Sequence, residues 1–183
     1  MRRLLLAGGV VAVLLVAALY VNQTGPAWYE RLRYPLHYSE YVRVHAKQNK
    51  LDPALLAAVI YQESKFDTGA RSSSGAIGLM QLTPATARGI AIRTGGSAFR
   101  IADLYDPEIN IRYGSWYLEN LFLKYKNERL VLAAYNAGQG NVDHWLADHE
   151  PIQFSETRAY VSRVEHLKHV YRDAWGKQLG PFG

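Results

Sequence analysis

The sequence has no cysteine, and this absence removes several classes of chemistry at once. Disulfide bonds, a catalytic thiol, zinc sites built on cysteine and a lipid-modified N-terminal cysteine are all excluded. Internal repeats and low-complexity tracts are also missing. A length of 183 residues suffices for one domain with a real core and a short extension. Without cysteine, that domain must be held together by packing alone.

A strong excess of one charge is lacking as well. The chain carries 21 Lys and Arg against 16 Asp and Glu, and two of the basic residues, Arg2 and Arg3, precede an apolar segment. Without these two, 19 basic residues face 16 acidic ones, an excess of +3. That excess is compatible with an anionic partner but far from a basic stripe, so no nucleic-acid partner is expected.

The N-terminus joins these arginines to a long apolar run. Residues 4–21 carry no charged side chain and are just long enough to cross a bilayer, which needs roughly 20 apolar residues. Residues 1–3 would form a basic cap in the cytoplasm, which sends everything after residue 21 outside. We expect an uncleaved transmembrane anchor helix. The alternative is a signal segment cleaved near the small residues 16–18, which would leave a secreted or periplasmic protein.

The rest of the chain divides into a juxtamembrane linker at residues 22–36 and one working domain at residues 37–183. This domain is predicted to be mainly α, because strand-like alternation is nearly absent outside a few residues near SSGAIG. The pattern of an N-cap residue followed by proline marks three helix starts, at Asp52-Pro53, Thr83-Pro84 and Asp106-Pro107.

The helix predicted to start at Asp52-Pro53, within LDPALLAAVIYQES, places a glutamate where an apolar residue is expected. Leu56, Val59, Ile60 and Glu63 share a helix face, so Glu63 ends an apolar stripe. Apolar surroundings raise the pKa of a carboxyl group, and an acid that is still protonated near neutral pH can act as a general acid. For an isolated glutamate, the simpler interpretation is a side chain that turns to water.

Two segments of small residues follow this helix. GARSSSGAIGLMQ, residues 69–81, can fold across Glu63 and leave an open groove, because glycine permits close backbone approach. Gln81 would there offer its amide to sugar hydroxyl or acetamido groups. AAYNAGQGNV, residues 133–142, brings polar side chains to a helix end that Gly138 can cap.

Three elements follow one another in this order and spacing: Glu63-Ser64, GAIGLMQLTPATA and AYNAG. With these elements the chain resembles the family 1 lytic transglycosylases of the soluble type, which are related in fold to goose-type lysozyme. ETRAYV at residues 156–161 is similar to a late element of the same family. The resemblance runs from about Tyr38 to Tyr171. It implies a lysozyme-like helical domain with a sugar-binding groove, preceded here by the membrane anchor helix.

The resemblance also implies roles for individual residues. Glu63 matches the catalytic acid/base. The residues that match substrate-binding or supporting positions are Ser64, Gln81, Tyr135, Asn136, Glu156 and Tyr160. The implied partners are peptidoglycan glycan strands and other cell-wall enzymes, and the N-terminal apolar run adds the membrane; the catalytic domain is expected in the bacterial cell envelope outside the cytoplasm.

The implied reaction cleaves the β-1,4 bond between N-acetylmuramic acid and N-acetylglucosamine and forms a 1,6-anhydro end. Most glycosidases use two carboxylates, but the 2-acetamido group of the substrate can replace the second one. No cofactor or metal is expected: His166 and His169 lie one helical turn apart, but no third ligand is near them in sequence. A goose-lysozyme-like hydrolase and a non-catalytic, membrane-tethered wall-binding module remain as alternatives.

Overall fold

The structure, a computed structural model, describes residues 13–16 and 25–182. The chain divides into two compact units, residues 1–35 and 36–183. In the first unit, helix α2 (Ala27–Arg33) follows Pro26 and buries none of its residues. The expected anchor at residues 4–21 lies outside the described residues except for 13–16. No helix of the described part is long and apolar enough to cross a bilayer.

The second unit is built from helices, which confirms the mainly α prediction. Among its described residues, only two isolated antiparallel bridges have strand pairing, Arg71 with Ile77 and Ile77 with Leu82. These fall where the sequence suggested brief strand character. The helices in chain order are α3 (Ser39–Gln48), α4 (Pro53–Ser64), α5 (Pro84–Thr94), the 3-10 helix η1 (Ile101–Tyr105), α6 (Pro107–Tyr125), α7 (Glu128–Ala137), α8 (Gln139–Ala147) and α9 (Ser155–Leu179).

All three predicted helix starts are confirmed in atomic detail. The side chain of Asp52 accepts from the backbone N–H of Ala54, that of Thr83 from Thr86, and that of Asp106 from Ile109. A proline occupies the first helical position in each case. The first N–H groups of a helix have no partner within the helix, so proline, which lacks an N–H, sacrifices no hydrogen bond at this position. Its fixed φ also suits the start of a helix.

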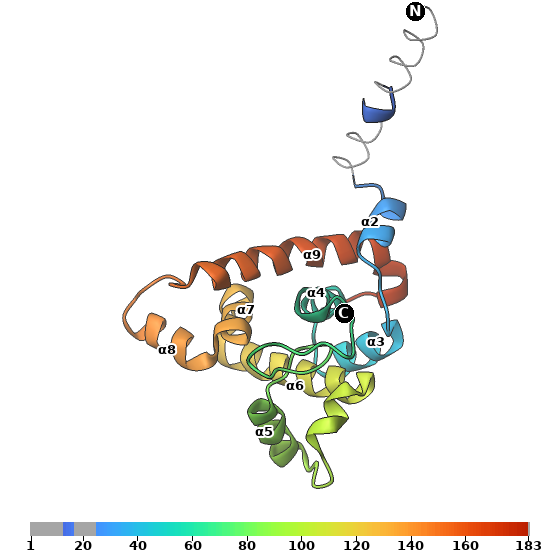
Figure 1. Cartoon of the computed structure of the whole chain (residues 1–183). Helices are drawn as coiled ribbons and strands as arrows, with labels where there is room; N and C mark the ends of the chain where they lie inside the picture. Colours follow the sequence, from blue (N-terminus) through green and yellow to red (C-terminus); the bar gives the residue numbers. More distant parts are fainter. Residues whose placement is uncertain (1–12, 17–24, 183) are drawn as a thin grey trace, which may run out of the picture. The chain divides into compact units, whose positions relative to one another are not determined.

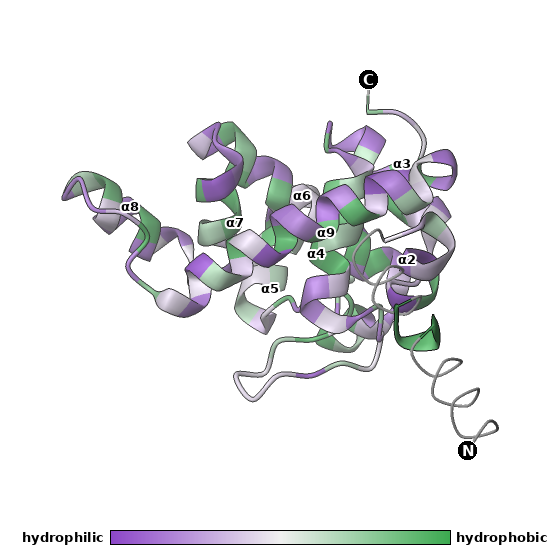
Figure 2. Cartoon of the chain, turned by 90° about the horizontal axis from the view of Figure 1, so that it is seen from above, coloured by the Kyte–Doolittle hydropathy of each residue, from purple (hydrophilic) through white to green (hydrophobic). Residues whose placement is uncertain are grey.

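Helix α4 is the centre of this unit. Figure 1 shows it between α9, which crosses above it, and α6 and α3 below, and Figure 2 shows its ribbon largely in the hydrophobic colour. All eight residues from Pro53 to Ile60 are buried. The helix is therefore apolar all round, and not only along the stripe that ends at Glu63, as the sequence suggested. Such a helix is a buried core helix.

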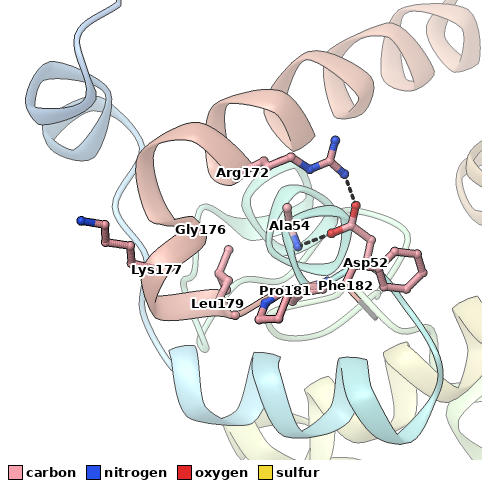
Figure 3. A pocket seen from close by; sticks show the side chains of 10 residues that line it. Asp52, Ala54, Arg172, Gly176, Lys177, Leu179, Pro181 and Phe182 are labelled. Carbon is pink, nitrogen blue, oxygen red and sulfur yellow. Dashed lines mark hydrogen bonds and ion pairs between the residues drawn. The ribbon is translucent and has the colours of Figure 1, made fainter.

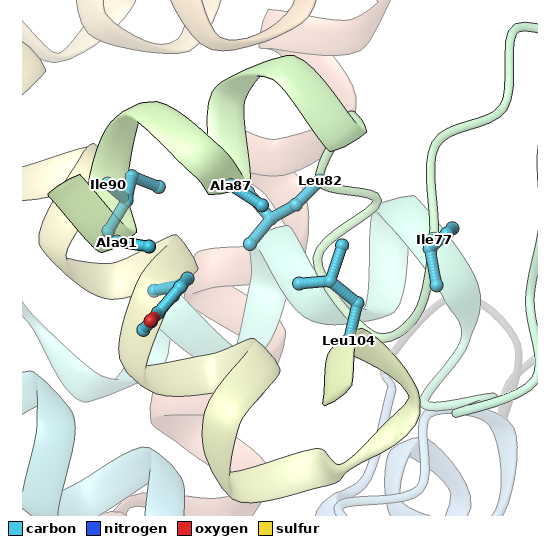
Figure 4. Close-up of a cluster of buried hydrophobic side chains, with 7 residues drawn as sticks. Ile77, Leu82, Ala87, Ile90, Ala91 and Leu104 are labelled. Atoms are coloured by element: carbon cyan, nitrogen blue, oxygen red, sulfur yellow. The ribbon is translucent and has the colours of Figure 1, made fainter. Parts of the chain in front are cut away.

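The segment between α4 and α5 is anchored by a cluster of buried side chains. Ile77 and Leu82 lie at its two bridges, and they belong to one cluster with apolar residues of α5, η1 and α6 (Figure 4): Ala87, Ile90, Ala91, Leu104 and Tyr113. Burying apolar area stabilises by about 25 cal/mol per Å². This loop of small residues is thus held against the core and not loose over it.

Candidate active site

Glu63 lies where the buried helix α4 reaches the surface. Residues up to Ile60 are buried, and the next four are partly exposed. The helix then stops because Lys65 and Phe66 both adopt the left-handed conformation, with φ of 54° and 66°. Phe66 is only 5% exposed and its ring contacts those of His37 and Tyr171. A left-handed turn is unfavourable for such residues, and the buried Phe66 ring holds it in place.

Within the described part of the chain, the carboxyl group of Glu63 has one hydrogen-bond partner, the hydroxyl of Tyr160 on α9, which donates to Oε1 at 2.7 Å. Burial raises the pKa of Glu63 from 4.5 to about 7, and the Tyr160 hydrogen bond opposes this rise without cancelling it. Tyr160 itself is 3% exposed. The site thus holds a carboxylic acid that keeps its proton to near neutral pH, as a general acid requires.

Tyr135, at the end of α7, lies near the acid but is bonded elsewhere. Its hydroxyl donates to the backbone oxygen of Met80 at 2.8 Å. The pKa of Tyr135 is raised well above its usual value, first by burial and then by the charge of Glu63. Its ring also packs against that of Tyr117, with centroids 5.6 Å apart. Tyr135 therefore joins α7 to the GLMQ segment beside Glu63.

Asn136 and Glu156 lie at the ends of two neighbouring helices. The side-chain oxygen of Asn136 accepts from the hydroxyl of Thr157 at 2.8 Å, and Asn136 is otherwise exposed. Glu156 is exposed on the first turn of α9. Among the described residues Glu156 makes no hydrogen bond or ion pair with Glu63. The substrate contact predicted for Glu156 stays a prediction.

Ser64 and Gln81 connect parts of the protein to one another. The Ser64 hydroxyl contacts the oxygen of Leu79 at 2.8 Å and that of Ile60 at 3.2 Å. The Gln81 amide nitrogen donates to the oxygens of Gly78 at 2.9 Å and Ala70 at 3.1 Å. The Ser64–Leu79 bond fixes the loop onto the end of α4, and the Gln81 bonds hold the loop to itself. The substrate contacts predicted for both residues stay predictions.

Asn110, on α6, is a supporting residue that the sequence analysis missed. It is fully buried, its Oδ1 accepts from the N–H of Met80 at 2.8 Å, and its Nδ2 donates to Ile77 and Leu104 oxygens at 3.0 and 2.8 Å. Gly78 makes this contact possible, because a Cβ there would lie 2.3 Å from Nδ2 of Asn110. An asparagine facing the core from a helix was the available signal, since a buried amide needs partners.

Thr157 was missed in the same way. It is 2% exposed and its hydroxyl holds the side chain of Asn136, although the sequence analysis chose only its neighbour Glu156. The spacing of three residues between Thr157 and Tyr160 could have pointed to it, since both lie on one face of α9. The first two turns of α9 therefore orient both Asn136 and Glu63.

A cavity lies at the opposite end of α4 from Glu63. It encloses about 560 Å³ between the start of α4 and the C-terminal segment (Figure 3). Asp52 caps α4 there and is paired with Arg172 of α9. This cavity does not contain Glu63, so the predicted sugar-binding groove stays a prediction. Among the described residues, no cluster of three or more His, Cys, Asp or Glu is arranged to hold a metal ion.

The site thus combines a central buried helix, an acid with a raised pKa at the end of that helix, and tyrosines of α7 and α9 near the acid. Residues 40–156 match the family described as the transglycosylase SLT domain, and the chain belongs to this family. The expected resemblance to the soluble lytic transglycosylases is thereby confirmed.

Individual relatives agree with this assignment. The soluble lytic murein transglycosylase of Salmonella typhimurium is 33% identical over 163 residues, which cover 80% of this chain and 24% of the relative. The membrane-bound lytic murein transglycosylase F of Yersinia enterocolitica is 42% identical over 100 residues, covering 51% of this chain and 19% of the relative. The chain thus spans about a quarter or less of these relatives.

Solved structures share the fold. The 70 kDa soluble lytic transglycosylase of Escherichia coli matches with a TM-score of 0.75 and 32% identity, over 82% of this chain and 26% of that one. An inactive glutamate-to-glutamine mutant of the lytic transglycosylase from Pseudomonas aeruginosa matches with a TM-score of 0.73 and 32% identity, over 88% and 28% of the two chains. A complex of the 70 kDa enzyme with bulgecin A is similar at a TM-score of 0.74, with 33% identity over 79% and 25% of the chains.

Proposed function

We propose that this protein is a lytic transglycosylase of bacterial peptidoglycan, with Glu63 as its single acid/base. It cleaves the β-1,4 bond between N-acetylmuramic acid and N-acetylglucosamine and leaves a 1,6-anhydro-N-acetylmuramic acid end. The observation that carries the proposal is the pKa of Glu63, raised to about 7 by burial at the end of α4. The relatives named as lytic murein transglycosylases supply the substrate class.

In the first step, protonated Glu63 gives its proton to the oxygen of the glycosidic bond. The bond between this oxygen and C1 of the muramic acid breaks, and the acetamido oxygen of the same sugar attacks C1. The positive charge then rests on the acetamido-derived ring, so no second protein carboxylate is needed.

In the second step, the Glu63 carboxylate removes the proton of the 6-hydroxyl group, whose oxygen closes onto C1. The acetamido group is released and the glutamic acid is restored, so no water is consumed. The Tyr160 hydroxyl, which donates to Oε1, stabilises the carboxylate that exists between the two steps. A hydrogen bond to a charged group contributes about 1.5–3 kcal/mol.

The neighbouring residues would orient the substrate and the acid. Tyr135 fixes the Met80 peptide beside Glu63, and Thr157 holds the amide of Asn136 where it can meet the acetamido group. Glu156 lies exposed on the same turn as Thr157 and can accept from sugar hydroxyls. In this proposal Ser64 and Gln81 act chiefly through the loop that they fix.

The N-terminal segment bears on where the enzyme works. We propose that residues 4–21 anchor the protein, with the catalytic unit in the cell envelope outside the cytoplasm and glycan strands and other cell-wall enzymes as its partners. The charge pattern of this segment and the envelope substrate support this placement. Membrane fractionation of the full chain and of a chain beginning at residue 22 would test it; equal recovery of both from the membrane would contradict it.

Mass analysis of the products tests the reaction directly. Purified peptidoglycan is digested with the full chain or with the Glu63→Gln variant, and the masses of the released muropeptides are measured by mass spectrometry. Anhydro products, lighter by one water than hydrolysed ones, are expected from the wild type and none from Glu63→Gln. Products of hydrolysed mass would show a lysozyme-like hydrolase instead. Binding to the wall without any product from the wild type would indicate a non-catalytic module.

A further inference from the structure

The start of α9 carries an aromatic ring that the proposed chemistry does not use. Phe154, the residue before the helix, is 47% exposed. Its ring meets that of Trp145 of α8 edge to face, with centroids 5.0 Å apart and an interplanar angle of 89°. Trp145 is only 4% exposed, so the exposed ring rests on a fixed one. Edge-to-face pairs of this kind are a preferred aromatic geometry.

The loop that leads to Phe154 is also fixed. Arg158, one turn into α9, donates through Nη1 to the backbone oxygens of Ile152 and Gln153, both at 2.7 Å. These two residues immediately precede Phe154. A ring that is already ordered loses little conformational entropy when a ligand covers it, and such rings are favoured in binding sites.

The position of Phe154 on the helix relates it to the acid. Phe154 is the N-cap of α9, and Thr157 and Tyr160 follow it in steps of three; each step turns about 60° around the axis, so the three lie within an arc of about 120° on one side of α9. Thr157 reaches Asn136 and Tyr160 reaches Glu63 on this side. At 1.5 Å per residue, Phe154 lies about 9 Å along the helix from Tyr160, roughly the length of two sugar rings.

We propose that Phe154 is a stacking platform for a sugar ring of the bound strand, about two rings away from the bond that is cleaved. The identity of the ligand rests on the proposed function. In a β-1,4 chain the bulky substituents are equatorial, so each sugar ring offers faces of C–H groups. An exposed aromatic face buries such a surface and needs no charge to do so. The adjacent carboxylate of Glu156 adds an acceptor for hydroxyl groups.

The test measures binding without turnover. Glu63→Gln is the parent, and glycan strands freed of their peptides are the probe in a sedimentation assay with the full chain. Phe154→Ala in this parent is expected to weaken binding about tenfold, the effect of truncating an aromatic anchor. Phe154→Tyr should retain binding. Leu123→Ala removes another exposed apolar side chain, 67% exposed on α6, and should change nothing.

Three results would overturn the proposal. The first is equal binding by the parent and Phe154→Ala. The second is a loss in both Phe154 variants together with a lower melting temperature, which would mean that the ring only packs on Trp145. The third is an effect seen with peptide-bearing wall but not with bare strands, which would point to a peptide or protein partner. Binding that depends on Phe154 while the wild type yields no anhydro product would contradict the proposed reaction and leave this inference intact.

Discussion

The hydroxyl of Tyr160 donates to Oε1 of Glu63 at 2.7 Å, although the two residues lie 97 positions apart in the chain. The bond crosses from α9 to the last turn of α4, where the core helix reaches the surface. Burial raises the pKa of the acid, and this hydrogen bond lowers it, so the two effects together set the value of about 7. The stability and the activity of the protein should both report this balance.

The first prediction concerns stability and pH. Because the folded-state pKa of Glu63, about 7, exceeds its ordinary 4.5, the folded chain binds more protons than the unfolded chain between these values. The contribution of Glu63 is therefore fully present below pH 4.5 and is lost as pH rises through 7. Glu63→Gln should gain stability relative to wild type over this window, by up to about 3 kcal/mol. Thermal melts of both proteins from pH 4 to 8 measure this; parallel curves would contradict it.

The second prediction concerns Tyr160. Tyr160→Phe removes the bond that lowers the pKa of Glu63, so the loss of kcat/KM at alkaline pH should move above its wild-type midpoint near 7. The carboxylate between the two steps also loses a donor, so the maximal rate should fall about tenfold or more. A pH–rate profile separates these effects. Tyr135→Phe is the matched control, because its hydroxyl bonds Met80 and not the acid; a shift of equal size there would count against the assignment.

The third prediction concerns Asn110. Asn110→Asp keeps the shape and the acceptor for the Met80 N–H but turns a carboxylate oxygen toward the Ile77 and Leu104 oxygens. The buried side chain of this variant would lose both hydrogen bonds that the Asn110 Nδ2 donates, and the free energy of unfolding should fall by about 3 kcal/mol or more. Activity should fall further than the folded fraction does, because the backbone oxygen of the same residue, Met80, accepts from the Tyr135 hydroxyl.

Asn120→Asp serves as the control for this change. Asn120 lies on the same helix and donates to the Trp116 oxygen, but it is only partly buried. Its substitution should lower stability by about 1 kcal/mol. Denaturant unfolding measures both variants, and equal losses would show that the three bonds of Asn110 have no special weight.

The fourth prediction concerns two glycines in helix interiors. A Cβ at Gly114 of α6 would lie 2.2 Å from the sulfur of Met80, whereas one at Gly176 of α9 would meet nothing within 4 Å. Gly114→Ala should therefore lower stability by about 1–3 kcal/mol through overpacking. Gly176→Ala should raise it by about 0.5–1 kcal/mol, since alanine is the better helix former. Melting temperatures that moved in the same direction would contradict this account of Gly114.

Local signals in the sequence located the helices well. The starts at Pro53, Pro84 and Pro107 were predictable because the cap and the proline act within one turn, independently of the rest of the fold. Family motifs likewise selected both Glu63 and Tyr160, which the structure joins by a hydrogen bond. The individual roles of Ser64 and Gln81 were less accessible, because their hydrogen bonds run to backbone oxygens that no motif reveals.

The sequence by itself determined that the chain is helical, that it carries a single candidate acid at a helix end, and that no thiol chemistry supports the fold or the site. Only the tertiary structure decided how that acid behaves. Its raised pKa depends on burial at the end of α4, and a donor to its carboxyl group comes from α9. The support from Asn110 and Thr157 likewise joins distant segments. Desolvation and hydrogen bonding depend on distances in space, and folding alone brings these residues within a few ångströms of one another.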